Sequence, residues 1–221
     1  MLIPATVLIK IFGYLLMFKR IIVAASFALF AVNAHALPFT NGSFENLGGQ
    51  SLQHGNWGYF PSMPGWTGVD NIEIHLGNGG NTFVTPADGK YYAELNAHPA
   101  QSGSFELHQT FDTVIGQTYS LDFYAQKRKH GDGSFSFSVG DIVSTAISDH
   151  IKGQWTKYSF LFTATGATST LGFLSGQGGN DTVGHYLDNI SVTAVPEPGV
   201  LALFAMGILG VFASRRWKRV Q

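Results

Sequence analysis

The sequence contains no cysteine. If the chain is exported, it has no disulfide bonds to stabilise it, and it has no thiol that could act as a nucleophile. A Gly-x-Ser-x-Gly nucleophile elbow is also missing, and the seven histidines between residues 37 and 194 show no His-Glu-x-x-His or comparable zinc spacing. Common signatures of hydrolases and zinc enzymes are thus absent, and a structural metal ion is one remaining way to stabilise the domain.

Charged residues are scarce, and cations are the scarcer kind. Only 12% of the residues are charged, and the whole chain has a formal net charge of −1. Between residues 37 and 194, however, six Lys and Arg stand against thirteen Asp and Glu, a net charge of −7. An acidic domain repels phosphate backbones, so we expect no nucleic-acid partner. The same charge suits divalent cations.

A full-length apolar span is missing at the C-terminus. The apolar segment 200–213 has fourteen residues, whereas a helix needs roughly 17–25 to cross a membrane core. The turn Pro196-Glu197-Pro198 precedes this segment, and Arg215 and Arg216 follow it. This order of turn, short apolar helix and arginines closely resembles the PEP-CTERM sorting signal of Gram-negative bacteria that make exopolysaccharide.

That resemblance implies a fate for residues 195–221. An exosortase, which is a membrane cysteine protease, would recognise the segment and remove it. Until then the apolar helix would hold the protein transiently in the inner membrane, with the arginines on the cytoplasmic side. The implied destination is the cell surface or the extracellular matrix. An ordinary C-terminal membrane anchor, with a transmembrane helix that is kept, is the alternative.

The N-terminus predicts a secretory signal peptide. Lys19 and Arg20 precede the apolar run 21–32, and the small-residue triplet 34–36 closes it. This arrangement predicts cleavage after Ala36, so that residues 1–36 are removed. Met17 stands directly before the basic residues, which makes it an alternative start.

What remains, residues 37–194, has the pattern of a single all-β domain. Period-two alternation is plainest in 134–139, where Phe135, Phe137 and Val139 fall on one face and serines on the other. About eight or nine short strands with one polar face each predict an antiparallel two-sheet sandwich. The other expected strands are 71–75, 90–96, 104–111, 119–123, 142–147, 154–163, 168–174 and 184–194.

Short motifs in a fixed order support this architecture. The motifs are Asn41-Gly42-Ser43-Phe44-Glu45, Pro64-Gly65-Trp66, Ile72-Glu73-Ile74, the segment 89–96, Gln109-Thr110-Phe111, the segment 116–119 and Leu187-Asp188-Asn189-Ile190. Their order resembles that of galactose-binding-like jelly rolls, which include carbohydrate-binding modules and choice-of-anchor proteins. The resemblance implies a non-catalytic jelly roll that binds or associates with polysaccharide.

Asp188 is the candidate for a buried charge. Simple alternation places Asp188 on the same inward face as Ile190 and Val192. A buried carboxylate needs hydrogen-bond donors or a cation, and backbone amides at a strand end are one alternative. The jelly-roll resemblance implies a structural calcium ion, Ca²⁺, held by Glu45 and Asp188. Backbone oxygens near Ser43 and Lys90 are implied helpers.

Aromatic residues next to polar ones are candidates for glycan binding, because the apolar face of a sugar ring stacks on indole or phenol. Alternation places Tyr124 on an outward face, and it gives Tyr92, Glu94 and Asn96 one shared parity. For Trp66 the alternative is a place in the core. The candidates for glycan binding are Trp57, Tyr59, Trp66, Tyr92, Glu94, Asn96 and Tyr124.

Two other functions compete with glycan binding. One is a purely structural matrix or surface protein without a glycan site. The other is a glycan-active enzyme in which Glu73 pairs with Glu94 or Glu106 as acid and base. The basic run 127–130 is either a solvated hairpin end or a docking point for acidic polysaccharide.

Overall fold

The structure is a computed structural model that describes residues 38–78, 84–95, 106–129, 133–175, 183–196 and 206–207. The predicted signal peptide, Asn96 and the sorting residues Glu197, Pro198, Arg215 and Arg216 lie outside the described residues. Ten strands are present in the described part of the chain. They are β1 (Trp57–Met63), β2 (Trp66–Leu76), β3 (Tyr91–Glu94), β4 (Glu106–Asp112), β5 (Thr118–Lys127), β6 (Phe135–Val139), β7 (Ile142–Val143), β8 (Thr156–Thr163), β9 (Thr168–Ser175) and β10 (His185–Ala194).

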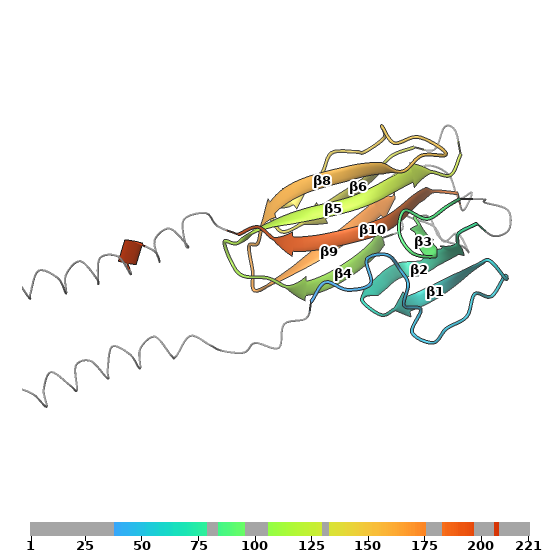
Figure 1. Cartoon of the computed structure of the whole chain (residues 1–221), viewed down its shortest axis with the longest axis horizontal. Helices are drawn as coiled ribbons and strands as arrows, with labels where there is room; N and C mark the ends of the chain where they lie inside the picture. Colours follow the sequence, from blue (N-terminus) through green and yellow to red (C-terminus); the bar gives the residue numbers. More distant parts are fainter. Residues whose placement is uncertain are drawn as a thin grey trace, which may run out of the picture. The chain divides into compact units, whose positions relative to one another are not determined.

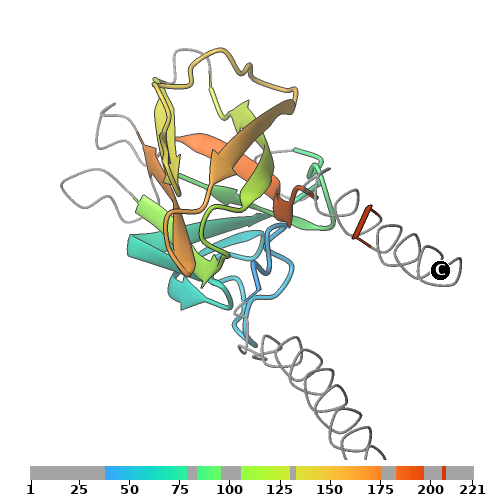
Figure 2. The same cartoon turned by 90° about the vertical axis from the view of Figure 1, so that its left-hand side faces the viewer.

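The strands form two facing layers, as Figures 1 and 2 show. Hydrogen bonds connect them in the order β7-β6-β9-β4-β2-β3-β10-β5-β8, with β1 paired to β2, and every pair of strands is antiparallel. The long strand β2 joins the layers. It pairs with β4 at Thr67 and Gly68, and with β3 from Glu73 onward. The predicted all-β antiparallel sandwich is confirmed, with β1 as a strand that the sequence pattern did not indicate.

Alternating aromatic residues fill the space between the layers. Phe123 on β5 lies 5.6 Å from Phe137 on β6 and 5.2 Å from Phe173 on β9, measured between ring centroids, and both contacts are edge-on. All three rings are almost fully buried. Burying a phenylalanine side chain contributes about 1.5–3 kcal/mol, so these contacts across the layers are a main source of stability in a chain without disulfides.

Trp66 belongs to this core. Its side chain is 1% exposed, and its indole N–H donates a 2.9 Å hydrogen bond to the carbonyl of Asn41. Phe39 and Phe44 pack on the indole with ring centroids 5.7 and 5.4 Å away. As a glycan platform, Trp66 is therefore a wrong prediction, because no face of its ring reaches the surface.

A β-bulge in β10 corrects the predicted position of Asp188. Leu187 pairs with Ala125 and Val192 pairs with Leu121, so both lie on the core side, although simple alternation would put them on opposite faces. The pairing shifts between Asp188 and Ser191, where an asparagine has a φ of 48°. Asp188 consequently lies on the side of the layer that faces away from the core.

Candidate functional site

One face of the layer containing β3, β10 and β5 collects most of the polar and aromatic candidates. We call this side, which points away from the core, the outer face. Direct cross-strand pairing runs from Tyr59 through Glu73, Glu94 and Tyr186 to Gln126. Paired residues of neighbouring strands point to the same side of a sheet. The five side chains therefore form a row across β1, β2, β3, β10 and β5.

A second row of rings lies beside the first. Trp57 pairs with His75, and His75 pairs with Tyr92. The His75 ring stacks on Tyr92 at 5.3 Å and 8°, and Trp57 stacks on His75 at 6.3 Å and 20°. His54 covers the other end of the row, 4.2 Å from Trp57. Four rings thus form a continuous stack from the β1 edge toward the middle of the outer face.

Five of the seven predicted glycan residues share this outer face. Trp57, Tyr59 and Tyr124 are partly exposed, whereas Tyr92 and Glu94 are buried. Alternation indicates the side of Tyr92, Glu94 and Tyr124, but not which of them solvent can reach. Trp57 and Tyr59 lie on β1, a strand that the sequence pattern did not indicate. His75, Tyr186 and Gln126, which the sequence analysis did not single out, complete the face. Parity with Glu73 on β2 and with Tyr124 on β5 could have found His75 and Gln126, whereas the bulge in β10 hides the side of Tyr186.

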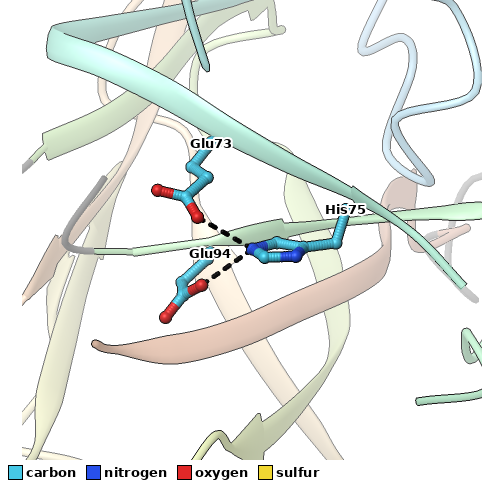
Figure 3. A group of neighbouring side chains, drawn as sticks. All are labelled: Glu73, His75 and Glu94. Carbon is cyan, nitrogen blue, oxygen red and sulfur yellow. Dashed lines mark hydrogen bonds and ion pairs between the residues drawn. The ribbon is translucent and has the colours of Figure 1, made fainter. Parts of the chain in front are cut away.

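The middle of the outer face is a buried charge network (Figure 3). Nε2 of His75 lies 2.9 Å from a carboxylate oxygen of Glu73 and 2.8 Å from one of Glu94. Each of the three residues is at most 3% exposed. Burial acts to lower the pKa of His75, but the hydrogen bonds and charges of the two carboxylates outweigh it and raise that pKa. The raised pKa favours the imidazolium form, whose Nε2–H faces both carboxylates.

A second cation completes the network. Nη1 of Arg128 lies 3.0 and 2.9 Å from the two carboxylate oxygens of Glu94, and the backbone N–H of Gly184 donates to Glu94 at 2.8 Å. Burial raises the pKa of Glu94, although the hydrogen bond to His75 and the charges of His75 and Arg128 act to lower it. The two carboxyl groups thus face the His75 ring and the Arg128 guanidinium, which offset their negative charge. This compensation explains how two carboxylates can be buried on adjacent strands.

The same atoms could ligate a metal ion. One nitrogen of His75 and one oxygen each of Glu73 and Glu94 lie within 4.8 Å of one another, the only such group of three His, Cys, Asp or Glu in the described part of the chain. Nitrogen and oxygen donors suit a transition metal. However, Arg128 already contacts both oxygens of Glu94. The arrangement therefore fits a metal-free ion network better than a metal centre.

The predicted acid–base pair coincides with this network. Glu73 and Glu94 bind the same imidazole nitrogen and are each 3% exposed, so a sugar cannot approach either carboxylate in this structure. The side chain of Glu106 lies outside the described residues. A catalytic role for Glu73 and Glu94 would require a substrate to reach the two carboxylates, and their burial prevents this.

A pocket of about 550 Å³ opens beside the network, where β5 ends and β10 begins. Gln126 and Tyr186 connect it to the first row of the outer face. Four of its other described lining residues are cations. The lining comprises Val84, Thr85, Gln126, Lys127, Arg128, Lys129, Lys152, Gly153, Trp155, Val183 and Tyr186.

Long-range contacts assemble the pocket walls. The indole N–H of Trp155 donates a 2.8 Å hydrogen bond to the carbonyl of Thr85, and the Trp155 ring meets Tyr92 edge-on at 6.0 Å. The backbone N–H of Lys127 donates to the carbonyl of Ile151 at 3.2 Å. These contacts bring three segments that are far apart in the sequence to one opening.

The predicted calcium residues surround one loop. Glu45 accepts hydrogen bonds from the backbone N–H groups of Lys90 and Tyr91 at 2.6 and 2.8 Å. Asp188 accepts one from the N–H of Asp88 at 3.0 Å, and the Ser43 hydroxyl donates to the Asp88 carboxylate at 2.7 Å. The structure thus brings the first and last motifs of the domain to the same loop, as expected, and backbone amides occupy both predicted carboxylates.

Close packing explains why this loop contains a glycine, Gly89. Gly89 has a φ of 65°, and a Cβ atom there would collide with the Glu45 carboxylate. A residue without a side chain lets the backbone approach that carboxylate closely. The carbonyl of Lys90, predicted as a helper ligand, accepts a 2.8 Å hydrogen bond from Gly77.

Fold and site together define a jelly-roll domain with an aromatic, polar outer face, as the sequence motifs predicted. The family model "Protein of unknown function (DUF642)" matches residues 37–193, and the chain belongs to this family. The PEP-CTERM protein-sorting motif matches residues 194–216, which confirms the resemblance of the tail and identifies an exported protein. Among the described residues, no helix is long and apolar enough to cross a membrane.

Several solved structures are similar to the chain. The enzymatically active domain of tailspike protein 4 of bacteriophage CBA120 is 17% identical over 72% of this chain and 21% of its own, with a TM-score of 0.42. TmCBM61, solved with β-1,4-galactotriose, is 15% identical over 72% and 99%, with a TM-score of 0.43. CBM35 from Paenibacillus barcinonensis is 17% identical over 64% and 100%, with a TM-score of 0.41.

No curated protein matches the chain significantly. These three structures are at most 17% identical to the chain, with TM-scores below 0.5, so they do not identify its function.

Proposed function

We propose that this exported protein is a non-catalytic module that binds polysaccharide at the cell surface or in the extracellular matrix. The observation that carries the proposal is the outer face, where a stack of rings reaches the surface at one end and a pocket opens at the other. Sugar recognition needs a flat aromatic surface next to a few polar groups, and the outer face offers both.

The accessible rings lie on the edge strand β1. Trp57 and Tyr59 are partly exposed, and their ring centroids are 6.2 Å apart. The side chain of Gln53 holds this edge in place, because it accepts a hydrogen bond from the N–H of Tyr59 and donates one to its carbonyl, both at 3.0 Å. Two rings held at this distance suit neighbouring units of an extended glycan chain.

We expect Trp57→Ala to weaken binding to the preferred polysaccharide about tenfold, because one stacking surface worth about 1–1.5 kcal/mol is lost. Affinity electrophoresis in gels containing a panel of polysaccharides measures the change in Kd. Val143→Ala is the control, since Val143 is 82% exposed on β7 in the other layer. Failure of the unaltered protein to bind any polysaccharide would favour the purely structural alternative.

The non-catalytic part of the proposal rests on burial. Glu73 and Glu94 are the carboxylate pair nearest the ring stack, and both are enclosed by their partners. We therefore expect no release of reducing ends from any polysaccharide that the protein binds. Release that Glu73→Gln abolishes would instead support a glycan-active enzyme.

Calcium would stabilise the loop around Asp88 and Gly89, whose backbone contacts Glu45 and Asp188. Burial raises the pKa of Asp188 to about 7, although hydrogen bonds from the backbone N–H groups of Asp88, Asn189 and Ala87 act to lower it. A bound divalent cation would favour the charged carboxylate, and Glu45, Asp88 and Ser43 offer further oxygens nearby.

If calcium binds there, a chelator lowers the Tm of the unaltered protein by several degrees, because a ligand that binds only the folded state stabilises it. Asp188→Ala lowers the Tm as well, and the chelator has no further effect on that variant. Asp141→Ala, on the loop between β6 and β7, serves as the control and keeps the response to the chelator. An identical Tm with and without chelator in the unaltered protein contradicts the calcium proposal.

The sorting segment determines where the module acts. The match to the PEP-CTERM motif supports processing by an exosortase after a transient stay in the inner membrane. Intact-mass analysis of the natively secreted product measures both ends of the mature chain. Ends near residue 37 and within residues 195–199 support both cleavages, whereas a product that retains residues 200–221 supports a permanent anchor.

A further inference from the structure

The pocket gathers most of the positive charge of an acidic domain. Six Lys and Arg lie between residues 37 and 194, and four of them line this one pocket: Lys127, Arg128, Lys129 and Lys152. The other two, Lys90 and Lys157, lie elsewhere. No Asp or Glu is among the described lining residues. The described lining of this pocket thus carries four cations and no anion, in a domain with a net charge of −7.

The fold creates this concentration from two distant segments. Residues 127–129 continue the end of β5, whereas Lys152 belongs to a turn some 25 residues later. A parallel bridge between Lys127 and Lys152 and the hydrogen bond from Lys127 to Ile151 join the two segments. Like charges held together in this way repel one another, so their juxtaposition favours an anion between them.

The buried carboxylates do not cancel this charge. Glu94 is not among the described lining residues, and it is paired with His75 as well as with Arg128. The other three cations of the described lining, Lys127, Lys129 and Lys152, therefore add to the positive potential of the opening. Lys129 and Lys152 are exposed, so a ligand can reach their side chains.

We propose that this pocket binds the carboxylate-bearing sugar of an anionic polysaccharide, such as a uronic acid unit. The inference rests on the proposed function and specifies its ligand class. The volume of the pocket, about 550 Å³, lies within the range of small-ligand sites. Trp155 and Tyr186 supply apolar ring surface, Gln126 supplies an amide for sugar hydroxyls, and the lysines supply the counter-charge.

The cations of the pocket favour a carboxylate over a phosphate group. The guanidinium of Arg128, which would suit bidentate phosphate recognition, is engaged with Glu94. A lysine ammonium group acts as a point charge, so it can pair with a single anionic group on a sugar. The carboxylate is therefore the ligand chemistry that we test, with sulfate as the competing anion.

The test compares three probes against the purified protein by affinity electrophoresis: polygalacturonate, its fully methyl-esterified form and dextran sulfate. The methyl ester keeps the backbone of the sugar chain and removes its charge. We expect polygalacturonate to bind at least tenfold more tightly than the ester and more tightly than dextran sulfate. The double variant Lys129→Gln/Lys152→Gln should weaken polygalacturonate binding at least tenfold, because screened ion pairs to two ammonium groups are lost.

Lys90→Gln/Lys157→Gln is the matched control, since it removes the same charge from the two lysines outside the pocket and should change Kd less than twofold. Equal binding of the ester, or equal weakening by both double variants, overturns the carboxylate inference. If Trp57→Ala still weakens binding in that case, the proposed function stands. Tighter binding of dextran sulfate assigns the pocket to sulfated sugars instead. No binding of any polysaccharide overturns both proposals.

Discussion

Replacing Glu94 by glutamine lowers the free energy of unfolding by about 3–5 kcal/mol. The neutral amide removes the Glu94 carboxylate from Arg128 and leaves His75 with Glu73. A cation that loses a carboxylate partner at a desolvated site is costly, whereas water solvates it after unfolding. Urea denaturation at pH 7 measures the loss. Asp141→Asn, on the exposed loop between β6 and β7, is the control and should cost less than 1.5 kcal/mol.

A double-mutant cycle separates the network from a general packing defect. Arg128→Met removes the partner of Glu94 while it keeps most of the aliphatic stem. Its cost should be smaller by at least 1 kcal/mol in the Glu94→Gln background than in the unaltered protein, because the ion pair is already lost there. Additive costs would mean that Glu94 and Arg128 do not stabilise each other and that the charge network is not an energetic unit.

Alternation predicts much of the outer face. Tyr92, Glu94 and Tyr124 lie on the side that the period of two indicates, since β3 and β5 are regular strands. The same rule fails for Asp188, because one extra residue in the β10 bulge reverses the parity of everything before it. A bulge depends on a single asparagine with a positive φ, which no hydrophobic pattern reveals.

Burial and partnership across the face are harder to predict. Alternation cannot indicate that Tyr92 is covered by Trp155, which lies 63 positions away, or that Arg128 reaches Glu94. Likewise, the basic run after β5 is visible in the sequence, but its meeting with Lys152 depends on a pairing between distant segments. The pocket is therefore a tertiary feature, even though three of its four cations lie in one short stretch.

A pair of buried histidines gives the domain a pH-dependent stability. Nε2 of His150 lies 2.8 Å from Nδ1 of His185, and the two side chains are 1% and 3% exposed. Both rings pack on Phe135, with centroids 5.2 and 5.3 Å from it. Burial, together with the charges of His185 and Lys127, lowers the pKa of His150 from 6.5 to about 4, against the opposing effect of Asp149.

The sign of the effect follows from linkage. The folded state binds a proton at His150 less readily than the unfolded state does. The contribution of neutral His150 to stability is therefore complete above pH 6.5 and is lost as the pH falls toward 4. We expect this one group to cost about 2 kcal/mol at pH 5 and about 3 kcal/mol at pH 4, relative to pH 7. Urea denaturation at the three pH values gives the free energy of unfolding.

His150→Leu isolates this contribution, because other groups titrate in the same range. Asp188, whose raised pKa of about 7 stabilises the fold as the pH falls, has the opposite sign. The difference in free energy between the unaltered protein and His150→Leu cancels Asp188 and should shrink by about 2 kcal/mol from pH 7 to pH 5. His54→Gln, at an exposed histidine, should keep the pH dependence of the unaltered protein. If His150→Leu also keeps it, then His150 accepts a proton in the folded state without cost, and the buried pair does not destabilise the domain in acid.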